Sequence, residues 1–105
     1  QYLFSRTTAS SEAVRGGRIE GCGRIEIHFM LSGSIVEDIA LTGDFFETGD
    51  ALAAFRRAFC GRPFVIASLL EGIRAEHPET TLRGMTEESL AALLQSREAA
   101  NEPAE

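Results

Sequence analysis

The sequence contains no lysine: all 10 basic residues are arginine, against 16 aspartate and glutamate residues, and the formal net charge is −6. A chain without lysine offers no Schiff-base lysine, no Walker-type phosphate loop, and no lysine amine to carry biotin or lipoate. Affinity for DNA or RNA comes mainly from clustered positive charge. The acidic balance therefore argues against nucleic acid as a partner.

Long apolar runs are also absent, because no stretch approaches the roughly 20 residues that span a bilayer, and no charged-then-apolar leader opens the chain. We therefore expect a cytoplasmic protein without membrane contact. Cysteine is scarce: Cys22 and Cys60 could pair, but small secreted domains that rely on disulfides usually carry more, which favours free thiols. The chain starts at Gln1 instead of methionine, which suggests a piece of a longer protein.

The residue types divide the chain into two halves. Most of the 10 glycines lie before residue 50, whereas most alanines lie after it. Strands and turns are therefore expected first and helices afterwards, within the one domain that 105 residues can form. The economical prediction is an α+β fold with two layers, in which about three antiparallel strands precede about three helices packed on one face.

Alternating apolar and polar residues over 25–31 predict a strand with one buried face. The turn residues 32–34 then predict a hairpin into a second strand over 35–42. Residues 13–20 can supply a third strand, although two adjacent glycines inside it leave its register open.

Glu37 interrupts the apolar face of the second predicted strand. It falls on the same face as Ile35, Ile39 and Leu41. We therefore expect either a bulge or an edge position that lets the Glu37 carboxylate reach water.

Three helices are predicted in the second half. Asp50 is a good N-cap for a helix that ends near Gly61, a second apolar stripe ends at His77 and Pro78, and a third helix begins at Thr86. Two glutamates follow Thr86, where they face the positive end of the helix dipole. The residues expected to be buried are Leu52, Phe55 and Phe59, then Ile66, Leu69, Leu70 and Ile73, then Leu90, Leu93 and Leu94.

Catalytic and metal-binding patterns are weak. The histidines are expected at the surface, His28 on the polar face of a strand and His77 at a helix end, and neither cysteine lies in a recognisable catalytic setting. No two of these four residues lie within four positions of each other, so we predict neither a metal site nor a catalytic residue. The glycines of 16–23 do not follow a strand and open a helix, as phosphate-binding loops do.

The segment Gly43-Asp44-Phe45-Phe46 is the main candidate for function. Neighbouring side chains diverge, so two adjacent phenylalanines cannot both enter the core, and one ring should be partly exposed. In one interpretation a turn at Gly43 lets both rings cap the ends of a small core. In the other, an aromatic ring beside a carboxylate docks against another domain. We call these four residues the candidate docking segment.

The motifs are arranged as in a known family. The sequence resembles the C-terminal accessory domain of bacterial lipoate-protein ligases. The matching parts are the candidate docking segment and residues 15–17, 23–29, 33–35 with 38–41, 52–61 and 84–90. The resemblance covers residues 15 to 95, and Gly-Asp-Phe-Phe after the second strand is its most specific motif. Cys22 and its flanking glycines depart from the family pattern, since a simple strand entry is expected there.

The resemblance implies a non-catalytic role. Family enzymes use ATP and Mg²⁺ to convert lipoate into lipoyl-adenylate, then pass the lipoyl group to a lysine of a lipoyl-domain protein. The catalytic domain holds the ligands and the catalytic lysine, so no cofactor and no enzyme activity is expected of this domain alone. The accessory domain packs over the catalytic site, supports adenylation and moves between the two steps; in some organisms it is a separate polypeptide. We expect this domain at 13–95, a linker remnant at 1–12, a flexible acidic tail at 96–105, and Arg15 or Arg24 supporting the docking segment.

Two other functions remain open. Iron–sulfur scaffold proteins have a fold that resembles this family's, and their first cysteine lies in a Cys-Gly turn much like Cys22 and Gly23. However, Asp44 stands where another cysteine is expected, Cys60 is not placed like the third, and a single thiolate holds no cluster. The remaining alternative is a standalone interaction domain that uses the same aromatic corner.

Overall fold

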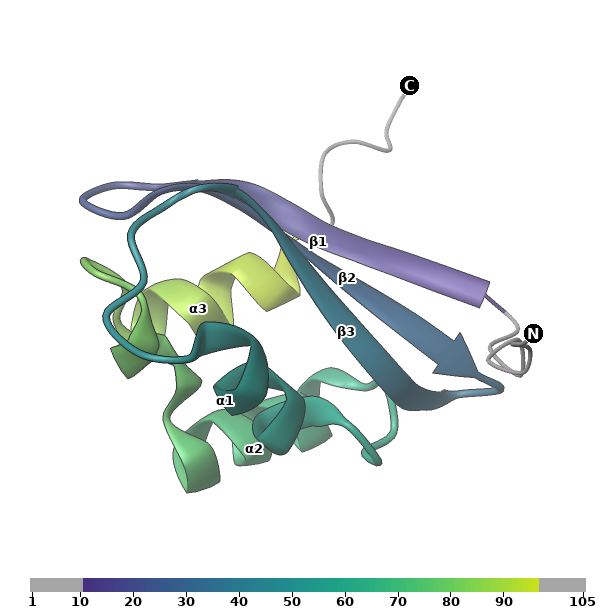
Figure 1. Ribbon diagram of the computed structural model, residues 1–105. Coiled ribbons are helices and arrows are strands. Elements are labelled where there is room, and N and C mark those ends of the chain that lie inside the picture. Colours follow the sequence, from purple (N-terminus) through teal and green to yellow (C-terminus); the bar gives the residue numbers. More distant parts are fainter. Residues whose placement is uncertain (1–10, 97–105) are drawn as a thin grey trace.

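The computed structural model describes residues 11–96 as a three-stranded sheet with helices on one of its faces (Figure 1). The strands are β1 (Ser11–Ile19), β2 (Gly23–Ser32) and β3 (Ile35–Asp44), and they form an antiparallel sheet in the order β1-β2-β3. They are followed by α1 (Ala51–Phe59), α2 (Ile66–Glu76), the short 3₁₀ helix η2 (Pro78–Thr81) and α3 (Glu87–Gln95). The predicted two-layer α+β architecture is confirmed.

β2 is the central strand and carries the predicted alternation. Four of its apolar side chains face the helices and are almost fully buried, while the residues between them, Met30 included, face the other way. We call the sheet face without helices the outer face. The buried residues of β2 are Ile25, Ile27, Phe29 and Leu31.

β3 contains the predicted bulge. Met30 pairs with Asp38 whereas Leu31 pairs with Val36, so Glu37 is the extra residue on the edge strand. The bulge changes which side chains face the core, because an inserted residue reverses the alternation. Val36 is buried and Ile35 is 39% exposed, so the expectation that Ile35 lies on the core face is wrong.

The helix starts agree with the predicted caps. Asp50 accepts a hydrogen bond from the Ala53 amide at 3.2 Å and caps α1. At α3, Thr86 Oγ1 accepts from the Ser89 amide at 3.0 Å, and the Thr86 amide donates to Ser89 Oγ at 2.9 Å. These reciprocal bonds form a capping box that satisfies two otherwise unpaired backbone donors.

Aromatic rings join the helices to the sheet. The Phe29 ring of β2 lies 5.7 Å from Phe59 of α1 and 4.9 Å from Phe64, and Phe55 lies 5.9 Å from Phe59, all measured between ring centroids. Such tilted and edge-on pairs are favourable beyond the area they bury. Of the residues predicted to be buried, Leu52 and Leu70 are only partly covered and Ile66 is 39% exposed.

Three predictions concern the two ends of the chain and its relation to membranes. The predicted linker over 1–12 and tail over 96–105 lie almost entirely outside the described residues, and β1 already begins at Ser11. Within 11–96, none of the helices is long and apolar enough to cross a membrane.

Candidate docking edge

The candidate docking segment is locked to β2 by two glycines. A Cβ atom on Gly23 would lie closer than 3.0 Å to the Asp44 carbonyl oxygen, and one on Gly43 would come equally close to the Arg24 carbonyl oxygen. Real Cβ atoms essentially never approach so closely. Both glycines also have positive φ, at 119° and 141°, which disfavours other residues. The end of β3 is therefore fixed against the start of β2.

A third glycine joins the same end of the molecule to the segment before α3. A Cβ atom on Gly84 would lie within 3.0 Å of the carbonyl oxygen of Gly21, in the turn between β1 and β2. Figure 1 shows this turn, the loop after β3 and the loop before α3 at one end of the fold. Three segments that are far apart in sequence thus meet here.

The loop after β3 is held on its other side by backbone hydrogen bonds. The Arg83 amide donates to the Phe46 carbonyl oxygen at 3.0 Å, and the Thr48 amide donates to the Thr81 carbonyl oxygen at 2.8 Å. Between them, Glu47 forms an isolated bridge with the segment before α3. The backbone that carries the two phenylalanines is therefore ordered from both sides.

The two adjacent phenylalanines divide between core and solvent. Phe45 packs partly buried against the core, whereas Phe46 is 71% exposed. Phe46 is the most exposed of the large hydrophobic residues that the structure describes. The expectation that one ring is exposed is confirmed, and its docking role remains a prediction.

Only one of the two candidate supporting arginines lies beside the docking segment. Arg24 pairs with Asp44 across β2 and β3, and its side chain is 60% exposed on the outer face. Arg15 lies on β1, beyond the central strand, and on the helix side of the sheet, where its guanidinium carbon is 5.1 Å from the centre of the Phe64 ring. We therefore define the docking edge as residues 43–46 together with Arg24.

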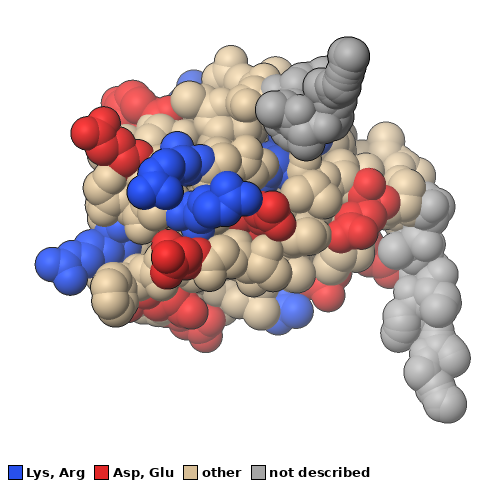
Figure 2. All heavy atoms as spheres, turned by 90° about the horizontal axis from the view of Figure 1, so that it is seen from above, with Lys and Arg blue, Asp and Glu red and all other residues tan. Residues whose placement is uncertain are grey.

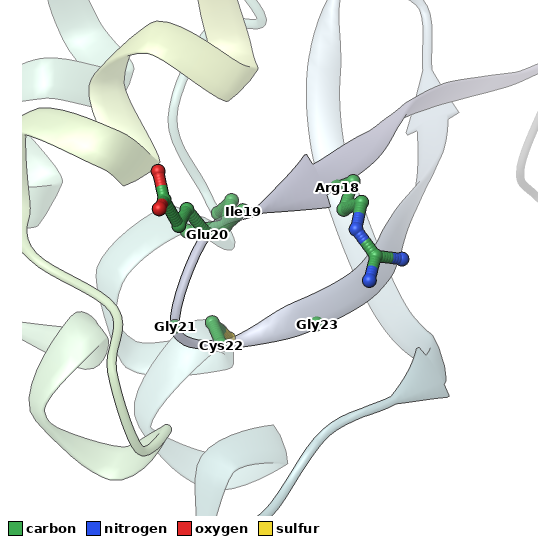
Figure 3. Close-up of a pocket in the computed structure, with 6 residues that line it drawn as sticks. All are labelled: Arg18, Ile19, Glu20, Gly21, Cys22 and Gly23. Carbon is green, nitrogen blue, oxygen red and sulfur yellow. The ribbon is translucent and has the colours of Figure 1, made fainter.

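A shallow pocket of about 500 Å³ lies beside the β1–β2 turn (Figure 3). Cys22 lies in this turn, and its amide donates to the Ile19 carbonyl oxygen at 2.9 Å. Burial raises the pKa of the Cys22 thiol, which keeps it protonated and makes it a weak nucleophile. At the position where a simple strand entry was expected, the structure has a tight hairpin turn. The pocket is lined by Arg18, Ile19, Glu20, Gly21, Cys22 and Gly23.

The outer face of the sheet carries charges of both signs side by side (Figure 2). At its centre, His28 Nδ1 lies 2.9 Å from Glu12 Oε2, and His28 Nε2 lies 3.3 Å from Thr42 Oγ1 and 3.5 Å from Glu26 Oε1. The predicted surface histidine is thus engaged by two carboxylates. Such a mixed surface offers no continuous positive field for nucleic acid.

The cysteines are free, as the sequence favours. Cys60 is the residue that ends α1. Burial raises the pKa of its thiol, and the negative charge of nearby Asp38 raises this pKa further, whereas the positive charge of Arg56 lowers it. Among the described residues, neither cysteine belongs to a group of three candidate metal ligands. Nothing in this part of the chain favours the iron–sulfur alternative.

Comparison with protein families finds a match over residues 10–94 to the family described as the bacterial lipoate protein ligase C-terminus. No curated protein matches the chain. The family match covers most of the sequence and confirms the resemblance found in its motifs.

Proposed function

Since this chain belongs to the family of bacterial lipoate protein ligase C-terminal domains, we propose that it is an accessory domain that docks on a ligase catalytic domain through the docking edge. The catalytic domain is either part of the same polypeptide or a separate one. Lipoyl-domain acceptor proteins are then indirect partners, because they receive the lipoyl group from the assembled enzyme.

The observation that carries this proposal is the presentation of Phe46. Phe46 is 71% exposed, yet the hydrogen bonds of residues 46 and 48 hold its backbone on one side while Gly43 holds the other. Aromatic residues, phenylalanine among them, are enriched in the buried centres of protein interfaces. An aromatic ring on an ordered backbone loses little further conformational entropy when a partner covers it, which favours affinity.

The described residues do not fit a site for ATP and Mg²⁺. Gly16 and Gly17 lie within β1, and Gly21 and Gly23 flank a hairpin turn between two strands, so neither pair opens a helix toward a phosphate. The chain also has no lysine to contact an adenylate. We therefore assign ATP, Mg²⁺, lipoate and the catalytic lysine to the partner domain.

The accessory domain acts as a lid in this proposal. A lid that covers the catalytic site excludes water from the activated acyl phosphate and orders nearby loops. Both effects favour the formation of lipoyl-adenylate, the first half-reaction. Contact through a single edge also allows the domain to leave when the lipoyl acceptor arrives.

The test is addition of the 105-residue chain to the isolated catalytic domain of its own ligase, with pyrophosphate release as the readout. We expect the native chain to accelerate pyrophosphate release. The Phe46→Ala chain should need a higher concentration to reach the same acceleration. Burying a phenylalanine side chain contributes about 1.5–3 kcal/mol, and since most of this ring is available, the apparent affinity should fall roughly 5- to 30-fold.

Val65→Ala is the matched control, because Val65 is also an exposed apolar residue, at 54%, but lies in the loop before α2. It should leave the acceleration unchanged. An absence of acceleration by the native chain, or equal acceleration by native and Phe46→Ala chains, would refute the proposal. Far-UV circular dichroism of each variant verifies that it is folded.

A further inference from the structure

A buried carboxylate in η2 lacks a full set of partners. Glu79 is 6% exposed, and its Oε1 is buried without any hydrogen bond, whereas its Oε2 lies 3.1 Å from His77 Nδ1. A buried carboxylate oxygen without a partner is strongly unfavourable. A water molecule or an ion is one way in which such an atom is satisfied.

Two further ligand atoms converge on Glu79. His77, Glu79 and Glu87 each offer one nitrogen or oxygen, and the three atoms lie within 4.8 Å of one another. They come from three elements: the residue that ends α2, the 3₁₀ helix η2, and the first residue of α3. The side chains of His77 and Glu87 are 53% and 40% exposed, so the group opens to solvent while Glu79 forms its buried member.

The charges around the group favour a cation. Two carboxylates lie close together, and Arg74 is the basic side chain beside them, with its Nε 3.9 Å from Glu87 Oε2. The two carboxylates carry more formal negative charge than this one guanidinium offsets. A divalent ion bound by the group would offset this negative charge.

We propose that His77, Glu79 and Glu87 bind a divalent transition-metal ion, with Zn²⁺ as the best fit. One imidazole nitrogen and two carboxylate oxygens match the ligand preference of zinc, whereas Mg²⁺ and Ca²⁺ favour oxygen ligands alone. Zinc–ligand distances of about 2.1 Å place tetrahedral ligands about 3.4 Å apart. The two exposed side chains can close the remaining gap by rotation, and the fourth position stays open to water.

Only part of this site is local in the sequence, because Glu79 follows His77 by two residues whereas Glu87 lies further along the chain. Closely spaced cysteines and histidines are the usual sequence signal of a metal site, and Glu87 stands beside Glu88 as a charge at a helix start. The fold instead brings Glu87 to His77, ten residues earlier in the chain. The proposal does not rest on the docking function, because none of the three residues belongs to the docking edge.

The experiment uses the 105-residue chain after treatment with EDTA and dialysis, titrated with ZnCl₂ by calorimetry and by thermal unfolding. We expect binding of one zinc ion per chain. Zinc at about 100 times its dissociation constant should raise the ratio of folded to unfolded chain about 100-fold, and the unfolding midpoint should rise by roughly 10 °C or more. MgCl₂ should produce no comparable rise.

Glu87→Gln should lower zinc affinity at least about 10-fold, since it removes one charged ligand at an exposed helix start. Glu88→Gln, one residue further along α3 and also exposed, is the matched control and should bind zinc normally. A chain with Cys22→Ser and Cys60→Ser should also keep the site. The proposal is overturned if zinc does not bind, if Glu87→Gln and Glu88→Gln behave alike, or if the cysteine variant loses binding.

Discussion

Alanine at Gly84 should destabilise the fold about twice as much as alanine at Gly33, although both glycines have left-handed backbones with φ of 83° and 65°. An L-residue in this region costs about 1–2 kcal/mol at either position. A Cβ on Gly33 would meet nothing within 4 Å, whereas a Cβ on Gly84 would lie within 3.0 Å of the Gly21 carbonyl group and 3.1 Å from the Cys22 amide nitrogen. Overpacking against backbone adds about 1–3 kcal/mol, so Gly84→Ala should cost roughly 2–5 kcal/mol in total.

The comparison is measured by thermal and urea unfolding followed by far-UV circular dichroism, since the chain has no tryptophan to report by fluorescence. In a domain of this size, 1 kcal/mol corresponds to about 4–8 °C in the unfolding midpoint. Gly33→Ala should therefore lower the midpoint by about 4–16 °C, and Gly84→Ala by about twice as much. Equal losses would refute the close contact between the β1–β2 turn and the segment before α3.

Two further predictions test local features. Thr86→Ala removes the hydroxyl that caps α3 and should lower the free energy of unfolding by about 0.5–2 kcal/mol. Thr86→Ser keeps a hydroxyl and should retain most of this stability. Thermal unfolding distinguishes the two variants, and equal losses would contradict the capping box. Burial raises the pKa of Cys22 and Cys60, so at pH 7 both should react with iodoacetamide more slowly than free cysteine, whose pKa is about 8.5, and faster as pH rises. Mass spectrometry of alkylated chains measures this, and rates equal to those in urea would contradict burial.

Local patterns in the sequence predict the elements because their causes are local. Alternation defines β2, and the side chains of Asp50 and Thr86 start α1 and α3 through hydrogen bonds that span three residues. Even the bulge follows from a single charged residue, Glu37, on an apolar face. Its consequence at Ile35 and Val36 was not predictable, because the pattern does not indicate on which side of the bulge the alternation is restored.

The contacts that build the candidate sites depend on tertiary structure. Nothing local to Gly84 indicates that it touches Gly21, and Arg15 and Arg24 look equivalent until strand pairing places them on opposite faces of the sheet. The exposure of one phenylalanine ring was predictable, but not which of the two rings it is. Adjacent side chains must diverge, but only the fold decides that Phe45 is the one that packs inward.

The docking edge is connected to the short helix η2, which contains the buried Glu79 carboxylate. Thr48, two residues after the exposed Phe46 ring, donates hydrogen bonds to the carbonyl oxygens of Thr80 and Thr81, at 2.9 and 2.8 Å. Thr80 and Thr81 belong to η2, as does Glu79. The loop that presents the ring is thus held by the element that contains the unpartnered carboxylate oxygen. An uncompensated charge there would weaken the support on which the ordered presentation of Phe46 depends, whereas an ion bound by η2 and α3 would strengthen it.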